Sequence, residues 1–336
     1  MAKQIDHARK LAESFGASLL EDIQPNGNPI STGCLAFDFL LQGGIPSGLI
    51  TEIVGDFSTG KSMLGLQLCR EVIKAGGWAV LIDSENSINK DFATKVLGVD
   101  ENLMYFIAED LESTYEFLVN LLEKQAKKAK AKKPCVIVWD TPAATPPAIV
   151  KGTKSGSPIA PAARVHSERI PLLLNYLRGT GIALVLVNQL RSKIGVLFGQ
   201  KWESYGGRAI RFYSSLRLHL TRGGRTKKNE QTTGTRGRME IIKSRICRPF
   251  TQVEFTIDFD RGIPPWSGTL ELFKKAGIIR QGKNSSLLSY YPKEGDRVIL
   301  KPIQISNPEI YQQMWDQADK EKLEMALSIK DKHNDK

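Results

Sequence analysis

GDFSTGKSML, at residues 55–64, is the stretch from which the fold of this chain can be worked out. Gly55 is followed by four residues and then by Gly60, Lys61 and Ser62, and the apolar run LITEIV, typical of a buried strand, comes directly before it. Between a strand and a helix, this spacing forms a phosphate-binding loop, because backbone N–H groups of small residues converge on anionic oxygens at the helix N-terminus. A glycine turn arising by chance is the alternative.

Eight consecutive residues of the loop are candidates for holding phosphates: Gly55, Asp56, Phe57, Ser58, Thr59, Gly60, Lys61 and Ser62. Lys61 adds a positive charge near the terminal phosphates, and the Ser62 hydroxyl can complete the shell of a Mg²⁺ ion. The loop therefore predicts a nucleotide-binding protein, and leaves open what the nucleotide drives.

Outward from the loop, apolar strand-like runs alternate regularly with helical segments. Strands are expected at residues 49–55, 78–85, 103–108, 135–140 and 182–189, with helices starting at 61, about 91, 112 and 164. This alternation predicts an α/β fold with a mostly parallel twisted sheet and helices on both faces. Later runs at residues 211–222, 236–246 and 250–259 have no helices between them and predict antiparallel or mixed strands.

Polar residues at the ends of these strands are the candidates for chemistry, because ligands of such sheets lie at the carboxyl ends of the strands. Asp140 closes the run VIVW and can support Mg²⁺. Glu85 is placed to orient or deprotonate a water for attack on the γ-phosphate, whereas a kinase would need an acceptor pocket. Gln189 either contacts the γ-phosphate and reports its presence to the following loop, or caps a strand end for structural reasons.

The positive charge of the chain is concentrated in one region. The formal net charge is +11, and residues 200–248 hold 13 Lys and Arg against three acids. This clustering favours a nucleic-acid surface over uniform solubilising charge, and a membrane surface is disfavoured because no amphipathic helix accompanies it. Two flexible segments, residues 144–164 and 191–210, are the candidate DNA-binding loops.

The second of these segments combines cations that can meet phosphates with aromatic rings that can stack on bases and glycines that allow close approach. Its candidate contacts are Arg191, Lys193, Lys201, Trp202, Tyr205, Gly206, Gly207, Arg208 and Arg211. The alternative is a mobile loop with incidental charges.

Lys243 and Arg245 form a separate pair of cations on a predicted strand. Being two residues apart, they are expected to project from the same face and to grip one anion together. If that face meets the nucleotide of another subunit, they act as fingers in trans that stabilise transition-state charge; otherwise they are ordinary surface charges.

Composition suggests three parts in this chain of 336 residues: an N-terminal oligomerisation arm at 1–30, a core at 31–265, and a small α+β region at 266–336 with a disordered tip. The arm contains a helical pattern at 3–16, and its alternative interpretation is a frayed tail. Four cysteines without ligand-like spacing, no long apolar run and no signal-peptide core predict a soluble cytoplasmic protein with no membrane partner.

Seven ordered motifs resemble those of the bacterial RecA recombinases over roughly residues 5–265. They are ISTGCLAFDFLLQGGIPSGLITEIVG, GDFSTGKS, IDSEN, VIVWDT, VNQLRSKIGVLFG, GGRAIRFYSSLRL and IIKSRICRPFTQVEF. The resemblance implies a RecA-like ATPase core that uses ATP and Mg²⁺ and hydrolyses ATP in a DNA-stimulated reaction. It also implies a helical filament of identical subunits on single-stranded DNA, pairing with homologous double-stranded DNA, and strand exchange in recombination and DNA repair.

Carried over position by position, the resemblance assigns further residues. Phe92 falls where the family stacks adenine with a tyrosine, and Asn89 replaces a nearby acid. The implied DNA contacts are Ile159, in place of a base-inserting methionine, and Arg164 in the first loop, and Gly206, Gly207 and Arg208 in the second. Arg222, beyond the second loop, is a further candidate DNA contact. Lys243 and Arg245 match two lysines that act in trans, and Phe212 resembles a residue that relays nucleotide state between subunits. A ring-forming DNA helicase and an ATP-binding filament scaffold without strand exchange are the alternatives.

Overall fold

The structure is a computed structural model that describes Lys10, Ser14 and residues 27–126, 133–150, 159–192, 202–282, 287–301 and 307–328. The predicted helix at 3–16, most of the predicted arm and the C-terminal tip lie outside these residues. No helix in the described part is both long and apolar enough to cross a membrane.

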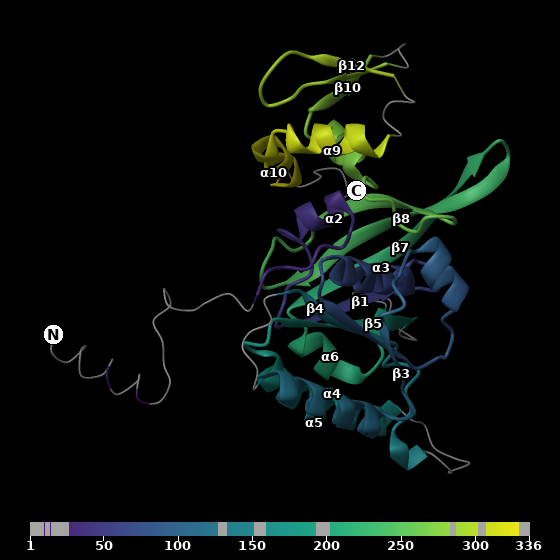
Figure 1. Cartoon of the computed structure of the whole chain (residues 1–336), viewed down its shortest axis with the longest axis vertical. Helices are drawn as coiled ribbons and strands as arrows, with labels where there is room; N and C mark the ends of the chain where they lie inside the picture. The colour runs from purple at the N-terminus through teal and green to yellow at the C-terminus, as the bar shows by residue number, and fades with distance from the viewer. Residues whose placement is uncertain are drawn as a thin grey trace.

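A large twisted sheet with the strand order β3-β2-β4-β5-β1-β7-β8-β9 forms the body of the molecule (Figure 1). Its strands are β1 (Ile50–Gly55), β2 (Trp78–Asp83), β3 (Met104–Ile107), β4 (Cys135–Asp140), β5 (Ile182–Ser192), β7 (Leu216–Lys228), β8 (Gln231–Ser244) and β9 (Gln252–Asp258). Neighbours from β3 to β7 pair in parallel, and β7, β8 and β9 pair antiparallel. The predicted α/β fold with a mostly parallel sheet and added antiparallel strands is confirmed.

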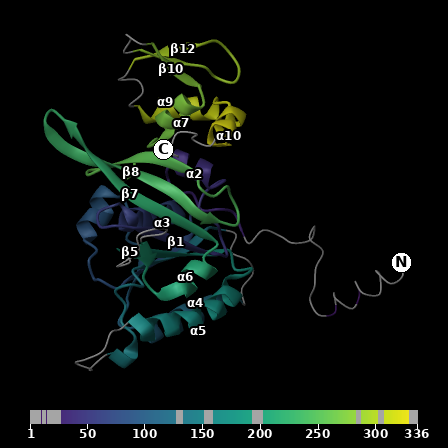
Figure 2. The ribbon, with the colours of Figure 1, turned by 180° about the vertical axis from the view of Figure 1, so that it is seen from behind.

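Helices cover both faces of the sheet, as the views from the front and from behind show (Figures 1 and 2). On one face lie α2 (Leu35–Leu40) and α3 (Lys61–Lys74), and on the other α4 (Leu111–Ala126), α5 (Ile159–Leu177) and α6 (Gly207–Tyr213). A π-helical turn at Phe92–Val96 takes the place of the helix predicted from about residue 91, and a 3₁₀ turn spans Ala148–Val150. The short strand β6 (Trp202–Ser204) pairs antiparallel with the end of β5.

The C-terminal elements lie at one end of the molecule, beyond β9 (Figures 1 and 2). They are α7 (Thr269–Lys275), the antiparallel sheet of β10 (Ile279–Gln281), β11 (Leu288–Tyr290) and β12 (Val298–Leu300), then α9 (Pro308–Asp316) and α10 (Lys320–Ser328). Their buried side chains, including Phe273, Tyr290 and Met314, belong to the same hydrophobic cluster as α2 and α3. Packing is therefore continuous from the large sheet into this region.

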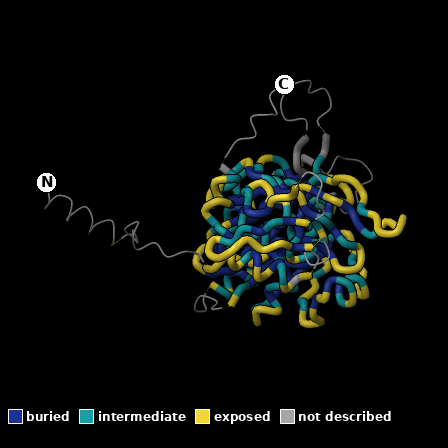
Figure 3. Tube along the Cα trace, turned by 90° about the horizontal axis from the view of Figure 1, so that it is seen from above, coloured by how far each residue is buried: buried dark blue, intermediate teal, exposed yellow. Residues whose placement is uncertain are grey.

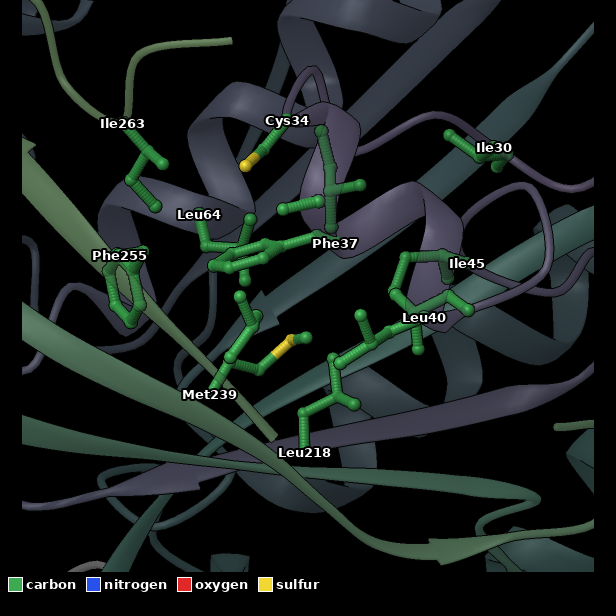
Figure 4. Packing of buried hydrophobic residues seen from close by; sticks show 14 of the residues in the cluster. Ile30, Cys34, Phe37, Leu40, Ile45, Leu64, Leu218, Met239, Phe255 and Ile263 are labelled. Carbon is green, nitrogen blue, oxygen red and sulfur yellow. The ribbon is translucent and has the colours of Figure 1, made fainter. Parts of the chain in front are cut away.

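Buried residues gather at the centre of the molecule and exposed residues at its rim (Figure 3). In the larger cluster, side chains from α2, α3 and the antiparallel strands meet between the layers (Figure 4). Phe37 of α2 packs edge-to-face on Phe255 of β9 with ring centroids 5.1 Å apart, beside Leu64 of α3 and Met239 of β8. Because β1 and α3 are held by this core, the loop between them stands on rigid supports.

The two edges of the large sheet differ. Ser267 covers part of β9, because its hydroxyl accepts the N–H of Thr256 at 2.6 Å and donates to the carbonyl of the same residue at 3.2 Å. At the opposite edge, β3 leaves three apolar side chains about half exposed, namely Met104 at 45%, Tyr105 at 46% and Ile107 at 54%. An apolar edge of this kind is a template for pairing with another chain.

Candidate functional site

The predicted phosphate-binding loop connects β1 to α3 as expected. Gly60 is the N-cap of α3 and has a φ of +90°, and no side chain caps the helix there. A Cβ at this position would lie 2.6 Å from Cδ1 of Ile257, so both the backbone angle and the space require glycine. The N-terminal N–H groups of α3 are therefore placed to bind an anion.

Lys61 lies inside the loop among acidic groups. Its Nζ donates to the carbonyl oxygen of Asp56 at 2.7 Å, and the hydroxyl of the buried Thr59 donates to the same oxygen at 3.0 Å. Burial lowers the pKa of Lys61, while the charges of Asp140, Asp56 and Glu85 act in the opposite direction. An ammonium held only by a carbonyl of its own loop can turn to a phosphate oxygen without leaving a buried charge unpaired.

The residues predicted at strand ends meet at one edge of the sheet. Gly55 of β1 pairs with Gln189 of β5, and Asp83 of β2 pairs with Asp140 of β4. Nε2 of Gln189 donates to Oε1 of Glu85 at 3.1 Å, although the two residues are 104 positions apart. The structure thus brings an amide and a carboxylate together beside the phosphate-binding loop.

Asp140 and Ser62 offer the oxygen donors that Mg²⁺ requires. The Ser62 hydroxyl hydrogen-bonds to the Asp140 carboxyl. Burial, together with the charges of Glu85 and Asp83, raises the pKa of Asp140 to about 6, while Ser62 and Lys61 act against this rise. A hydroxyl and a carboxylate fit a hard cation, but the described residues contain no cluster of three or more His, Cys, Asp or Glu side chains for a metal. Phosphate oxygens and waters would have to complete the coordination.

Without nucleotide and Mg²⁺, Asp140→Asn is expected to stabilise the protein at neutral pH. The folded state binds the Asp140 proton more tightly than the unfolded chain, with a pKa of about 6 against 3.8. The contribution of Asp140 to wild-type stability should therefore increase as the pH falls from above 6 towards 4. Urea unfolding should show the variant more stable by about 1–3 kcal/mol at pH 7.5 and equal to wild type near pH 4. The same difference at both pH values would contradict this prediction.

Phe92 begins the π-helical turn, and Asn89 lies three residues before it. Oδ1 of Asn89 accepts the N–H of Phe92 at 3.0 Å, so the amide oxygen already has a partner. Phe92 is partly buried and packs against the larger hydrophobic cluster. Their contact with a nucleotide base stays a prediction.

The first candidate DNA loop differs from the prediction at its end. Helix α5 begins at Ile159 and not near residue 164, so Arg164 lies within the helix, where its Nε is 2.9 Å from Oε1 of Glu168. The guanidinium is exposed and this i,i+4 pair is weak, so the group remains accessible to a phosphate. Residues 151–158 and the side chain of Ile159 lie outside the description.

The second candidate loop returns to the sheet through β6. Lys193, Lys201 and the side chains of Arg191 and Trp202 are not described, whereas Arg191 and Glu203 are paired in the backbone register. Gly206 and Gly207 have φ values of +87° and +74° and open α6, and Arg208 is exposed next to them. Arg222 is exposed on β7.

The prediction that the Tyr205 ring stacks on bases is wrong, because the ring is buried. It is only 6% exposed and belongs to the cluster beneath α4, α5 and α6. Its N–H donates to the carbonyl of Gln189 at 3.3 Å, and its own carbonyl accepts Nδ2 of Asn188 at 2.9 Å. Tyr205 therefore anchors the end of the loop to β5, next to the proposed phosphate sensor.

Lys243 and Arg245 lie away from the carboxyl end of β1, which carries the phosphate-binding loop. Lys243 pairs with Arg217, whereas Gly55 pairs with Leu220, three residues and about 10 Å further along β7. Strand β8 ends at Ser244, so Arg245 follows the strand and does not share it, contrary to the prediction. Nζ of Lys243 donates to the carbonyls of Arg211 and Phe212, both at 2.8 Å, at the end of α6.

The surroundings of Lys243 favour its neutral form. Burial lowers the pKa of Lys243, and the charges of Arg245 and Arg217 lower it further, while Glu52 opposes them. Phe212 is 65% exposed next to this pair. The cations, the exposed ring and the end of α6 thus lie together on one surface.

The sequence interpretation missed a buried polar network beneath these sites. Oε2 of Glu52 lies 2.5 Å from Nε of Arg217, with the two side chains 0% and 8% exposed. Oε1 of Glu52 accepts Nδ2 of Asn188 at 2.9 Å. The signal was the single acid inside the apolar run LITEIV, since a charge on a buried strand requires a partner.

Comparison with known proteins identifies the family. The profile of the RecA N-terminal domain family matches residues 6–264. The protein named Protein RecA of Rubrobacter xylanophilus is 35% identical over 254 residues, which are 75% of this chain and 72% of that protein. Those of Cytophaga hutchinsonii and Legionella pneumophila are each 33% identical, over 90% and 89% of this chain and 85% of their own lengths. The chain belongs to the RecA family.

Proposed function

We propose that this RecA-family recombinase binds and hydrolyses ATP and assembles on single-stranded DNA to pair it with a homologous duplex. One observation carries the proposal: the phosphate-binding loop, Asp140 and the Glu85–Gln189 contact of 3.1 Å converge at one edge of the sheet. This is the arrangement that phosphoryl transfer to water requires, with groups for phosphate, metal and attacking water side by side.

Each residue at this edge has a proposed role. Lys61 and the N–H groups at the start of α3 hold the phosphates, and Ser62 and Asp140 are the ligands for Mg²⁺. Bound Mg²⁺ supplies positive charge that offsets the negative charge of the transferring phosphoryl group. Glu85 orients the attacking water and accepts its proton. Gln189 contacts Glu85 in the structure, and a γ-phosphate offers its amide a new partner.

The link from nucleotide to DNA runs through the second loop. Asn188, adjacent to Gln189, is bonded to the carbonyl of Tyr205, and Tyr205 directly precedes the glycines that open α6. A change at Gln189 is therefore passed along β5 to both ends of the loop. Arg208, Arg164 and Arg222 are exposed for phosphates, with Trp202 proposed to stack on bases.

Assembly is proposed to be head to tail. The half-exposed edge strand β3 offers a place for the N-terminal arm of a neighbour, residues 1–30. Lys243 and Arg245 lie away from the end of β1 that carries their own loop and are proposed to reach the ATP of the next subunit. Because such an interface is heterologous, it continues as a helical filament.

The proposal is tested by DNA binding and strand exchange with the purified chain. A slowly hydrolysed ATP analogue should tighten binding to a single-stranded oligonucleotide relative to ADP. The affinity for this DNA should fall steeply as the salt concentration rises, and electron microscopy should show filaments. With ATP, a labelled homologous duplex should exchange its strand. Equal affinity in both nucleotides would overturn the proposal, and filaments without exchange or rings with unwinding would indicate a scaffold or a helicase.

Lys243→Ala is expected to reduce DNA-stimulated ATP hydrolysis by about ten- to a hundredfold, because Arg245 remains to supply part of the charge in trans. The two hydrogen bonds to α6 are also lost, which should lower the free energy of unfolding by only about 1 kcal/mol, so the subunit stays folded. Phosphate release and thermal unfolding measure the two effects. Lys275→Ala, at an exposed lysine of α7, is the control, and unchanged turnover in Lys243→Ala would remove the trans role.

A further inference from the structure

The Glu85 loop is held by one buried carboxylate. Asp83, at the end of β2, is 1% exposed. Its Oδ1 accepts the N–H of Glu85 at 3.0 Å, and its Oδ2 accepts the N–H groups of Ser87 and Ile88 at 3.0 and 3.2 Å. This one side chain therefore holds three backbone N–H groups between Glu85 and Ile88, where the chain turns sharply with Asn86 at a φ of +47°.

Asp83 has one side-chain donor among the described residues, and it comes from the edge strand. The hydroxyl of Tyr105 donates to Oδ2 of Asp83 at 2.8 Å and lies 3.4 Å from Oδ1 of Asn86 in the same loop. Partial burial, together with the adjacent Asp83 carboxylate, raises the pKa of Tyr105 to about 12, so the phenol keeps its proton at neutral pH. The bond joins β3 to the loop that carries Glu85.

We infer that Tyr105 is a positioning residue for ATP hydrolysis, which through Asp83 holds the Glu85 carboxylate in place against Gln189. The inference rests on the proposed role of Glu85. An attacking water is effective only when its base is held within a fraction of an ångström, so a donor that fixes the base's loop should act on turnover and not on nucleotide binding. Neither hydrogen-bond partner of the Tyr105 hydroxyl belongs to the phosphate-binding loop.

The position of Tyr105 makes this contact responsive to assembly. The ring is 46% exposed on the outermost strand of the sheet, next to Met104 and Ile107. A strand added there from a neighbouring subunit would cover the ring and exclude water that competes for Asp83. Hydrolysis would then be faster in an assembled subunit than in a free one.

Tyr105→Phe tests the inference because it removes one oxygen and keeps the ring. In the full chain with saturating single-stranded DNA, kcat for ATP hydrolysis should fall about fivefold, with KM for ATP and the thermal midpoint unchanged. The gain in DNA affinity from the ATP analogue should also be unchanged. Tyr176→Phe, the same change at a partly buried tyrosine of α5, is the matched control and should keep the wild-type kcat.

Three outcomes would overturn the inference. A kcat for Tyr105→Phe within twofold of wild type excludes positioning. A loss of kcat accompanied by an equal loss in Tyr176→Phe, or by a raised KM and a lowered thermal midpoint, indicates a disturbance that does not depend on the hydrogen bond to Asp83. Glu85→Gln separates the proposed role of Glu85 from the inferred role of Tyr105. If Glu85→Gln still hydrolyses ATP, the proposed role of Glu85 is wrong, and the inference about Tyr105 is wrong with it. If Glu85→Gln is inactive while Tyr105→Phe is fully active, only the inference about Tyr105 is wrong.

Discussion

Replacing Lys61 by alanine is expected to reduce ATP hydrolysis by about a thousandfold and to abolish strand exchange. Lys61 is the only cation in the stretch from Gly55 to Leu64, and its Nζ lies inside the loop, 2.7 Å from the carbonyl of Asp56. Alanine there leaves Asp140, Asp56 and Glu85 facing the phosphates without the positive charge that now opposes them. Phosphate release with saturating DNA measures the loss.

Lys74→Ala is the control for the Lys61 variant. Lys74 ends the same helix, is 62% exposed and makes only a long contact of 3.8 Å with Glu71, so its loss should leave hydrolysis unchanged. Because the loop backbone is fixed by Gly60 and the core, Lys61→Ala should also unfold at the wild-type temperature. Wild-type turnover in Lys61→Ala would refute the assignment of the loop.

Glu52→Ala is expected to lower the free energy of unfolding by about 3–5 kcal/mol. The substitution removes the carboxylate that pairs with the buried Arg217 guanidinium, and it removes one of the two acceptors of Asn188 Nδ2. Urea or guanidinium unfolding, followed by circular dichroism, measures the change.

The double variant Glu52→Met/Arg217→Met separates the burial of charge from the packing. Buried ion pairs replaced by apolar side chains of similar volume are often neutral or stabilising, so the double variant should regain most of the stability that Glu52→Ala loses. If the single variant is as stable as wild type, the Glu52–Arg217 contact carries no energetic weight and the network described here has no structural role.

The nucleotide edge of the fold could be predicted because its information is local. The whole motif of the phosphate-binding loop lies within the eight residues from Gly55 to Ser62. Glu85, Asp140 and Gln189 each stand at the end of an apolar strand that can be recognised in the sequence. Parallel pairing then places these ends together, which the contact between Gln189 and Glu85 bears out.

Contacts between distant segments could not be predicted in this way. Glu52 and Arg217 are 165 positions apart, and no spacing connects them. Tyr205 was expected to meet DNA because an aromatic ring in a basic loop looks the same in sequence whether it is buried or free. Lys243 was expected to project, but the end of a short helix supplied two carbonyls that its ammonium could cap.

The start of α5 could not be predicted correctly from the sequence either. Helix initiation at Ile159 is followed by a proline at position 161, a residue tolerated in the first turn, so the helix begins five residues earlier than the apolar spacing indicated. The consequence for function is that Arg164 stands on a rigid helix. Its distance to any bound strand is then set by α5 and not by the loop before it.

The unequal edges of the large sheet give any polymer of this chain a direction. The β9 side is partly closed by Ser267, whereas the β3 side is open. A row of subunits that grows by strand addition at β3 would have an exposed, unpaired β3 edge at one end only. Addition and loss of subunits would then proceed at different rates at the two termini, and a short peptide that occupies β3 would block growth at one of them only.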